Sequence, residues 1–224
     1  MKVKEVQLEF LGHSGFLITT GGGKRIAIDP YMVAESVAPV DLVLITHSHY
    51  DHCSIKDIMR LARKGTSIVV PADAQSKIAH IDGVNMQIIE VGDELAFGSL
   101  KIEALPAYNI KKDFHPKSEG WLGYILKLEG VVIYHTGDSD NIPEMKKLTG
   151  YGKQDNIFIT LLPVSGTYVM TAEEAADVAS LLNPSYAIPM HYGAGVAGTI
   201  EDAQRFVKLC DAINVHAEIL EKIL

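Results

Sequence analysis

Short apolar runs divide this chain into a series of predicted strands. The runs are rich in Val, Ile, Leu and Phe and end at Gly, Pro or Asp, which favours extended chain interrupted by turns. Gly21-Gly22-Gly23 supplies the backbone freedom for one hairpin. The predicted strands cover residues 6–10, 15–19, 25–28, 41–45, 67–70, 86–89, 100–104, 124–128, 131–134, 157–161, 186–189 and 215–220.

Apolar residues spaced three or four positions apart predict helices over 54–63, 72–80 and 171–182, and a last helix after Thr199. Thr171 and Glu174 have the spacing of a capping box, which favours a helix start at that point. Strands dominate the first part of the chain, and strands mixed with helices follow. This order predicts an α/β (α+β) fold, a four-layer αββα sandwich of two mixed β-sheets flanked by helices.

The size and composition favour an ordinary globular protein. With 224 residues, 47% of them hydrophobic and 21% charged, the chain is long enough for a sizeable core. We therefore expect a single domain over residues 1–224. The sequence leaves the oligomeric state open, a homo-oligomer included.

Charge and cysteine content indicate which partners and which cellular compartment to expect. The net charge is −8, from 20 basic and 28 acidic residues, which argues against a nucleic-acid partner. The first residues contain no apolar segment typical of a signal peptide, and no apolar run approaches the roughly 20 residues of a membrane-spanning helix. Cys53 and Cys210 do not form a disulfide framework. We expect a cytoplasmic protein with no membrane partner.

The stretch Thr46-His47-Ser48-His49-Tyr50-Asp51-His52 concentrates metal-binding side chains directly after a predicted strand. His47 and His49 are two positions apart, so in extended chain they project to the same side and can bind one ion together. A tight turn can direct the neighbouring Asp51 and His52 to a second point beside the first. A polar loop with many histidines by chance is the alternative, but soluble loops rarely gather three His and one Asp. We therefore predict two adjacent metal sites.

The pattern His-x-His-x-Asp-His after an apolar strand resembles the signature of the metallo-β-lactamase fold superfamily. The resemblance implies a single domain of that type, with an Asp at a later strand end and a last His further along. Asp138 and His191 stand in those places. By this resemblance Asp138 bridges the two ions, since a carboxylate has two oxygens to offer.

The third ligand of the first ion is open. Most members of the superfamily carry a His where the strand 100–104 ends, and here that place reads Pro106-Ala107-Tyr108-Asn109. His115, six residues beyond Asn109, is one candidate. Asn109 itself or a water molecule is the other.

Further passages resemble a branch of small metal-dependent hydrolases that includes the L-ascorbate-6-phosphate lactonases and, more distantly, N-acyl-phosphatidylethanolamine phospholipase D. This resemblance implies a fold and a metal site but no substrate. The passages are Gly12-His13-Ser14-Gly15-Phe16, Asp29-Pro30, Pro163-Val164-Ser165-Gly166-Thr167-Tyr168 and Ile188-Pro189-Met190-His191-Tyr192.

Imidazole and carboxylate ligands predict zinc first, with manganese or iron as alternatives. Two divalent ions roughly 3.5–4 Å apart would hold a bridging hydroxide as the nucleophile, with Asp51 and Asp138 as the catalytic carboxylates. Four positive charges, less two carboxylates and one hydroxide, leave +1, which favours a small anionic substrate. Lys111, Lys112 and Lys117 either add to that preference or form a solvated charged loop.

The segment 106–123 lacks periodicity and is rich in aromatic and polar residues, which is typical of a functional loop. We expect the substrate pocket to include His13, Asn109, Trp121 and Tyr168. His135, beside a core strand, is expected to support the site or to pack in the core.

The leading hypothesis is a metal-dependent hydrolase of a lactone or phosphoester. A nuclease of the same superfamily is a second hypothesis, but the 53 positions between Asp138 and His191 (191 − 138) are too few for the inserted domain of RNA-processing members. A metal-dependent binding or sensor protein without turnover is a third.

Overall fold

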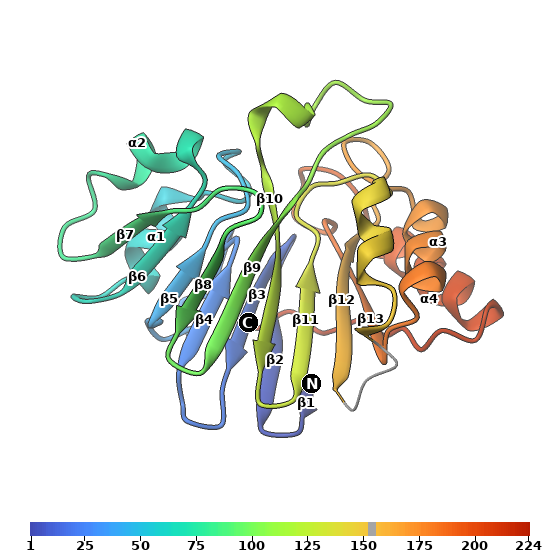
Figure 1. Cartoon of the computed structure of the whole chain (residues 1–224), viewed down its shortest axis with the longest axis horizontal. Helices are drawn as coiled ribbons and strands as arrows, with labels where there is room; N and C mark the ends of the chain where they lie inside the picture. Colours follow the sequence, from blue (N-terminus) through green and yellow to red (C-terminus); the bar gives the residue numbers. More distant parts are fainter. Residues whose placement is uncertain (152–155) are drawn as a thin grey trace.

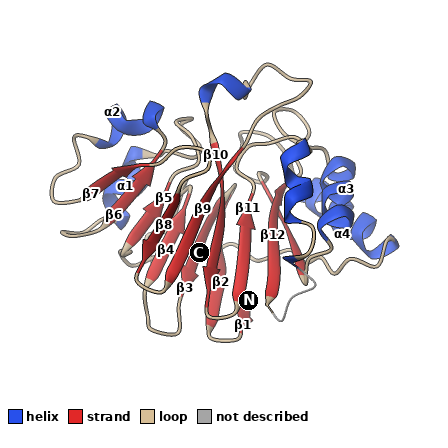
Figure 2. Ribbon diagram, in the orientation of Figure 1, coloured by secondary structure: helices blue, strands red, loops and turns tan. Residues whose placement is uncertain are grey.

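Two β-sheets pack face to face in the computed structural model, with helices on the outside (Figures 1 and 2). The structure describes residues 1–151 and 156–224. Helices α1 and α2 lie beside the first sheet, and α3 and α4 lie beside the second (Figure 2). This arrangement confirms the predicted αββα sandwich.

The first sheet has seven strands in sequence order, antiparallel from β1 to β4 and parallel from β4 to β7. Its strands are β1 (Lys2–Val3), β2 (Val6–Gly12), β3 (Gly15–Thr19), β4 (Arg25–Ile28), β5 (Leu42–Leu44), β6 (Ser67–Val70) and β7 (Asn85–Ile88). The helices between them are α1 (Ile55–Leu61), the 3₁₀ helix η1 (Ala72–Ala74) and α2 (Gln75–Ile78).

The second sheet has six strands in the order β13-β12-β11-β10-β9-β8, antiparallel from β8 to β11 and parallel from β11 to β13. Its strands are β8 (Glu94–Phe97), β9 (Leu100–Pro106), β10 (Leu122–Leu128), β11 (Val131–His135), β12 (Ile157–Pro163) and β13 (Tyr186–Met190). The helices are η2 (Lys117–Glu119), η3 (Pro143–Leu148), α3 (Ala172–Leu182) and α4 (Ile200–Ala212). Among the described residues, no helix combines the length and apolar character that crossing a membrane requires.

Alternation along the strands produces the layers. In β3, Phe16 and Ile18 face the core between the sheets, whereas Leu17 faces the outer side, where it packs in a cluster with Ile58 and Leu61 of α1. All five side chains are buried. Because each such side chain contributes about 1.5–3 kcal/mol on burial, both faces of the first sheet stabilise the sandwich.

The predicted edge strand over 215–220 is wrong. This segment forms only an isolated bridge, Ala217 with Ala187 of β13, and just beyond it Lys222 bridges to Phe10 of β2. It passes from the second sheet to the first, so it cannot continue a ladder with either. The sequence prediction also missed β1 and β8, which are short and carry charged residues, and the helix over 72–80 is divided into η1 and α2.

The parallel strands set the position of the functional loops. Strands β5, β11, β12 and β13 end at the same edge of the sandwich, where the loops that follow them come together (Figure 1). The long connection between β9 and β10 rises over the same edge (Figure 1). Ligands of α/β sheets typically bind at the carboxyl ends of strands, so this edge is the place to look for a site.

Candidate metal centre

The loop after β5 is held by a buried aspartate at the end of β4. Asp29 accepts hydrogen bonds from the Thr46 backbone N–H (2.8 Å) and hydroxyl (2.6 Å). Beyond it, the N–H groups of His52 and Cys53 donate to the His49 carbonyl at 3.1 and 2.7 Å. This turn brings Asp51 and His52 back beside the first two histidines, as the sequence predicted.

All seven predicted ligands converge on one place. Their donor atoms fall into three groups, each with its atoms within 4.8 Å of one another. The groups are His47, His49 and His115; His47, His52 and Asp138; and His13, Asp51, His52 and His191. The group that contains Asp138 shares His47 with the first group and His52 with the third, so the three groups form one continuous cluster of possible ligands.

Asp138 lies between the groups. Its Oδ2 is 3.1 Å from His191 Nε2 and 3.2 Å from His115 Nε2, while its Oδ1 is 3.2 Å from His52 Nε2. Ligand atoms around a tetrahedral ion with bonds of 2.0–2.1 Å are about 3.4 Å apart. The carboxylate therefore has the position that a bridging ligand requires.

Unpaired buried atoms test whether these residues fit a metal. His52 Nε2, His115 Nε2 and Asp138 Oδ1 are buried and have no hydrogen-bond partner. Such atoms destabilise a fold by about 1–3 kcal/mol each unless something satisfies them. All three face the same centre, so a cation placed there would satisfy them together, and the donor set fits a divalent metal.

In four of the candidate histidine ligands, the ring nitrogen Nδ1 has a polar partner. Fixing Nδ1 in this way leaves Nε2 with its lone pair toward the centre, which is the usual support of metal-binding histidines. The pairs are His47 with Thr46 Oγ1 (2.9 Å), His52 with Asp29 Oδ2 (2.8 Å), His115 with Asn109 Oδ1 (3.0 Å) and His191 with Ser165 Oγ (2.9 Å).

The open question of the third ligand has a geometric answer. His115 joins the group of His47 and His49. The Asn109 amide oxygen accepts from the backbone N–H and Nδ1 of His115, and its amide nitrogen donates to Asp140 and to the Tyr168 carbonyl. Asn109 is thus fully engaged in holding His115, which is the residue placed to complete the first site.

A cavity of about 190 Å³ opens onto the centre. Of the four residues expected to form the pocket, only Tyr168 lines it; His13, Asn109 and Trp121 do not. The lining residues are His49, Tyr50, Asp51, Phe114, His115, Asp138, Tyr168, His191 and Val196.

Trp121 packs behind the first group instead of forming a pocket wall. Its ring centroid lies 4.9 Å from that of His47, 4.7 Å from His49 and 5.4 Å from His115. Its indole N–H donates to Asp73 Oδ2 at 2.6 Å. Because β10 begins at Leu122, directly after it, the sheet fixes the position of this aromatic support.

His13 belongs to the group of Asp51, His52 and His191, which it reaches from a strained turn between β2 and β3. Its φ of 56° is in the left-handed region, and its carbonyl accepts from the His191 N–H at 2.6 Å. Its Nε2 lies 2.9 Å from Asp51 Oδ2, and its ring is 4.2 Å from that of His191. His13 therefore holds Asp51 and packs on a ligand without reaching the cavity surface.

The electrostatics favour the protonation states that metal ligands need. Burial lowers the pKa of His47 well below its usual value and that of His13 to about 4. Burial alone would raise the pKa of Asp51, but the hydrogen bond to His13 and the charges of His52 and His13 together outweigh burial and hold the pKa at about 2. The neighbouring His191 and His52 likewise keep the pKa of Asp138 low despite burial. Charged carboxylates and neutral imidazoles are the forms that bind metals.

His52 is the exception among the histidines. Burial disfavours its charged form, but the carboxylates of Asp138 and Asp29 outweigh burial and raise its pKa well above the usual value. A proton on this ring therefore competes with a metal for the same nitrogen, and binding of a metal releases it.

His135 has the supporting role that the sequence suggested. Its Nε2 donates to the Ser14 carbonyl at 2.9 Å, and its Nδ1 accepts from the Gly137 N–H at 3.1 Å. These bonds tie the end of β11 to the first sheet, directly before Asp138. Asp29 and Ser165 also serve the site, and both lie in passages that resemble the hydrolase branch, although the sequence predicted no role for them there. Phe114, which lines the cavity, carried no such signal.

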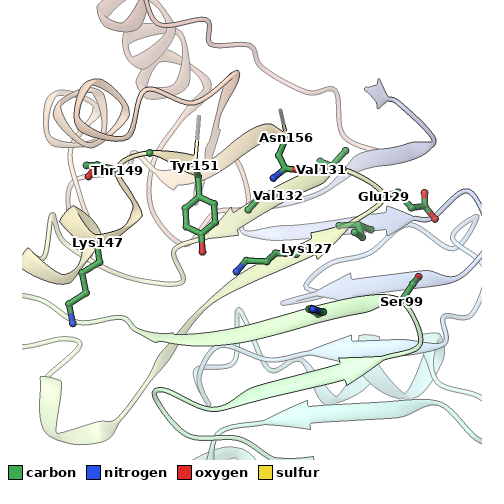
Figure 3. Close-up of a pocket in the computed structure, with 13 residues that line it drawn as sticks. Ser99, Lys127, Glu129, Val131, Val132, Lys147, Thr149, Tyr151 and Asn156 are labelled. Carbon is green, nitrogen blue, oxygen red and sulfur yellow. The ribbon is translucent and has the colours of Figure 1, made fainter. Parts of the chain in front are cut away.

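A larger hollow, of about 620 Å³, lies around the turn between β10 and β11 (Figure 3). Figure 3 shows Lys127 and Tyr151 at its wall, and the Lys127 ammonium is 5.2 Å from the centre of the Tyr151 ring. Because β11 runs from this turn toward Asp138, the hollow is at the other end of the sheet, and it contains none of the candidate ligands.

Comparison with known proteins agrees with the fold and the site. The profile of the beta-lactamase superfamily domain matches residues 7–191. A UPF0173 metal-dependent hydrolase of Thermococcus onnurineus is 36% identical over 225 residues, covering 96% of this chain and 95% of the relative. Another, of Pyrococcus furiosus, is 35% identical over 198 residues and covers 84% of each chain.

Solved structures of other proteins show the same fold as this chain. The crystal structure of a candidate metal-dependent hydrolase from Parabacteroides distasonis superposes with a TM-score of 0.82 at 28% identity, covering 97% of this chain and 94% of that one. A metallo hydrolase from Ignicoccus hospitalis gives a TM-score of 0.74 at 25% identity, over 96% and 95% of the two chains. A sandwich with metal-ligand groups at one edge defines the metallo-β-lactamase class of folds. This chain belongs to the beta-lactamase superfamily.

Proposed function

We propose that this protein is a metal-dependent hydrolase that cleaves a lactone or phosphoester of a small molecule with a water-derived nucleophile. The position of Asp138 between two histidine groups, with unpaired buried atoms on both sides, carries the proposal. The relatives from Thermococcus and Pyrococcus, which are named metal-dependent hydrolases, support it.

Seven side chains would hold two metal ions. His47, His49 and His115 form one group, Asp51, His52 and His191 form the other, and Asp138 contacts both. Two such ions, when bound, lower the pKa of a shared water and polarise the oxygen of the scissile bond. Zinc suits these nitrogen and carboxylate donors best, with manganese and iron as alternatives.

The protein's own contribution is orientation of the ligands. The hydrogen bonds with Thr46, Asn109 and Ser165 fix the rings of His47, His115 and His191 before any ligand arrives. Fixed donors need no rearrangement during the reaction, which is the main source of electrostatic catalysis. Hydrolysis then adds one water across the C–O or P–O bond of the substrate, with the leaving oxygen taking a proton.

A cysteine nucleophile is disfavoured. Cys53 directly follows the ligand cluster, but its thiol is buried, and burial raises its pKa to about 12. The same cause raises the pKa of Cys210 to about 12. Since the thiolate is the reactive form, neither residue supplies a nucleophile at neutral pH, which is consistent with the proposed water-derived nucleophile.

Metal content and turnover, measured on the same preparation, test the proposal. We expect two zinc or manganese ions per chain and hydrolysis of at least one member of a panel of lactones, phosphodiesters and thioesters. Removal of metal by a chelator should abolish activity, and addition of metal should restore it. One tightly bound ion with no hydrolysis would support a binding or sensor protein instead.

A further inference from the structure

The walls of the cavity at the metal centre are apolar where they face away from the ligands. Phe114, Tyr168 and Val196 line it together with Tyr50, and the remaining lining residues are all candidate ligands. None of the lining residues among those described is a Lys or Arg. We propose that the substrate is a small lactone or ester whose non-reacting part is uncharged and apolar, and that a phosphate-bearing tail is selected against. This inference rests on the proposed function.

Two of the three lysines expected to attract an anion are engaged elsewhere, and the third, Lys111, does not line the cavity. Lys112 donates to Asp140 Oδ1 at 3.0 Å and to the Val169 carbonyl at 2.6 Å, so it ties the loop to the end of β11 and to the segment before α3. Lys117 binds Glu144 Oε1 at 2.7 Å and lies over the Tyr108 ring. Both positive charges are compensated by carboxylates, and neither side chain lines the cavity.

A phosphate group in this cavity would have no side chain to pair with. Phosphate recognition in proteins relies on Arg, Lys or clustered backbone N–H groups. The charged residues that line this cavity are Asp51 and Asp138, both of them candidate ligands whose charge the metal ions would offset. A phosphate on the non-reacting part of the substrate, away from the ions, would meet only the apolar walls, so its desolvation would go uncompensated.

The apolar walls are arranged to enclose a small group. The ring of Phe114 meets that of Tyr168 edge-on, with centroids 4.7 Å apart at 84°. Phe114 is 50% exposed and Tyr50 is 62% exposed, so both present aromatic surface at the mouth. Apolar side chains exposed at the rim of a polar centre are typical of a binding surface.

The volume limits the size of the substrate. Sites for drug-sized ligands usually enclose about 300–1,000 Å³, and this cavity offers about 190 Å³. A single ring with a short alkyl substituent fits this volume. A sugar phosphate is larger and adds a charged group that these walls do not pair.

Three lactones with the same reacting ring separate the effects of charge and apolar surface. The probes are δ-octanolactone, glucono-δ-lactone and 6-phosphoglucono-δ-lactone, and the last two differ only by the phosphate. On the zinc-loaded protein we expect kcat/KM to be at least tenfold higher for δ-octanolactone than for glucono-δ-lactone. We expect the phosphate to lower it at least tenfold further.

Substitutions in the 106–123 loop test whether the cavity wall causes the preference for the apolar lactone. Phe114→Ala should lower kcat/KM for δ-octanolactone about tenfold, and Phe114→Lys should improve the relative rate of the phosphorylated lactone at least tenfold. Ile110→Ala, an equally exposed apolar position in the same loop that does not line the cavity, should change neither ratio. A wild-type preference for the phosphorylated lactone would overturn the inference while leaving a hydrolase in place.

Binding keeps the two proposals distinguishable if none of the lactones is hydrolysed. That result would count against the proposed function for this bond type. Calorimetric titration of the zinc-loaded protein with 5-hydroxyoctanoate and 6-phosphogluconate would then decide the inference alone. We expect the alkyl acid to bind at least tenfold more tightly, with the advantage lost in Phe114→Ala. Equal or tighter binding of 6-phosphogluconate, unchanged in that variant, would refute the apolar cavity.

Discussion

Asp138 Oδ2 lies 3.1 Å from His191 Nε2, although 53 positions separate the two residues in the sequence. The parallel strands β11, β12 and β13 produce this contact, because Asp138 follows the first of them and His191 follows the last. Two strand ends on one sheet thus place a carboxylate and an imidazole within the reach of one ion.

Replacing Asp138 by asparagine should disrupt both metal sites at once. The substitution keeps the shape but removes the charge that two cations would share. We expect the metal content to fall from two ions to at most one per chain and activity to fall at least 100-fold. Metal analysis after dialysis checks this. Asp177→Asn, at an exposed position of α3, is the control and should behave as wild type. Two retained ions in Asp138→Asn would contradict the bridging role.

Asn109→Ala should weaken the site that contains His115. The substitution removes the oxygen that accepts from His115 Nδ1 and so orients the ring. The His115 ring remains but is free to turn, so its Nε2 is no longer held toward the metal site. Loss of such supporting partners typically lowers metal affinity 10–100-fold. Competition with a chromophoric chelator measures this, with the exposed Asn85→Ala as the matched control. An unchanged affinity for both ions would show that Asn109 does not position the ligand.

Trp121→Phe should destabilise the fold without removing a ligand. The phenyl ring keeps the packing on His47 and His49 but loses the 2.6 Å bond to Asp73. Asp73 is half-buried, and loss of its donor should lower the free energy of unfolding by about 1–3 kcal/mol. Urea denaturation of the metal-free protein tests this, and Tyr50→Phe, at an exposed hydroxyl, should cause no change. Equal stability of Trp121→Phe would mean that water replaces the bond.

The metal-free protein should lose stability as the pH falls from 6.5 toward 4. Burial lowers the pKa of His13 from 6.5 to about 4, so the unfolded chain takes up a proton over this range and the folded protein does not. Acidification should therefore lower the free energy of unfolding, by roughly 3 kcal/mol over the whole range. His13→Gln can keep a donor to Asp51 but cannot titrate, so its stability should depend less on pH. Parallel urea titrations at pH 7 and 4.5 measure the difference. Identical pH dependence in both proteins would exclude His13 as the cause.

The sequence alone was sufficient to predict the residues whose chemistry is local. The His-x-His-x-Asp-His spacing identified four of the possible ligands, the resemblance to the metallo-β-lactamase fold superfamily added Asp138 and His191, and His115 was one of the alternatives left open. The sandwich was predicted from the order of strands and helices along the chain, because strands first and then strands mixed with helices fit two packed sheets with helices outside.

Long-range contacts could not be predicted in the same way. Trp121 was expected in the pocket wall, yet its position depends on the register of β10 against β9 and on the partner Asp73. The roles of Phe114 and of Lys112 likewise depend on the path of an irregular loop, which no periodicity specifies. The segment 215–220 has the pattern of a strand, but it connects two sheets instead of extending one.

A crystal structure of the zinc-loaded protein, with anomalous scattering recorded at the zinc edge, tests the central claim most directly. We predict two peaks roughly 3.5–4 Å apart, one bound by His47, His49 and His115 and the other by Asp51, His52 and His191. One Asp138 oxygen should lie within bonding distance of each peak. A single peak, or an Asp138 side chain turned away from both positions, would contradict the account.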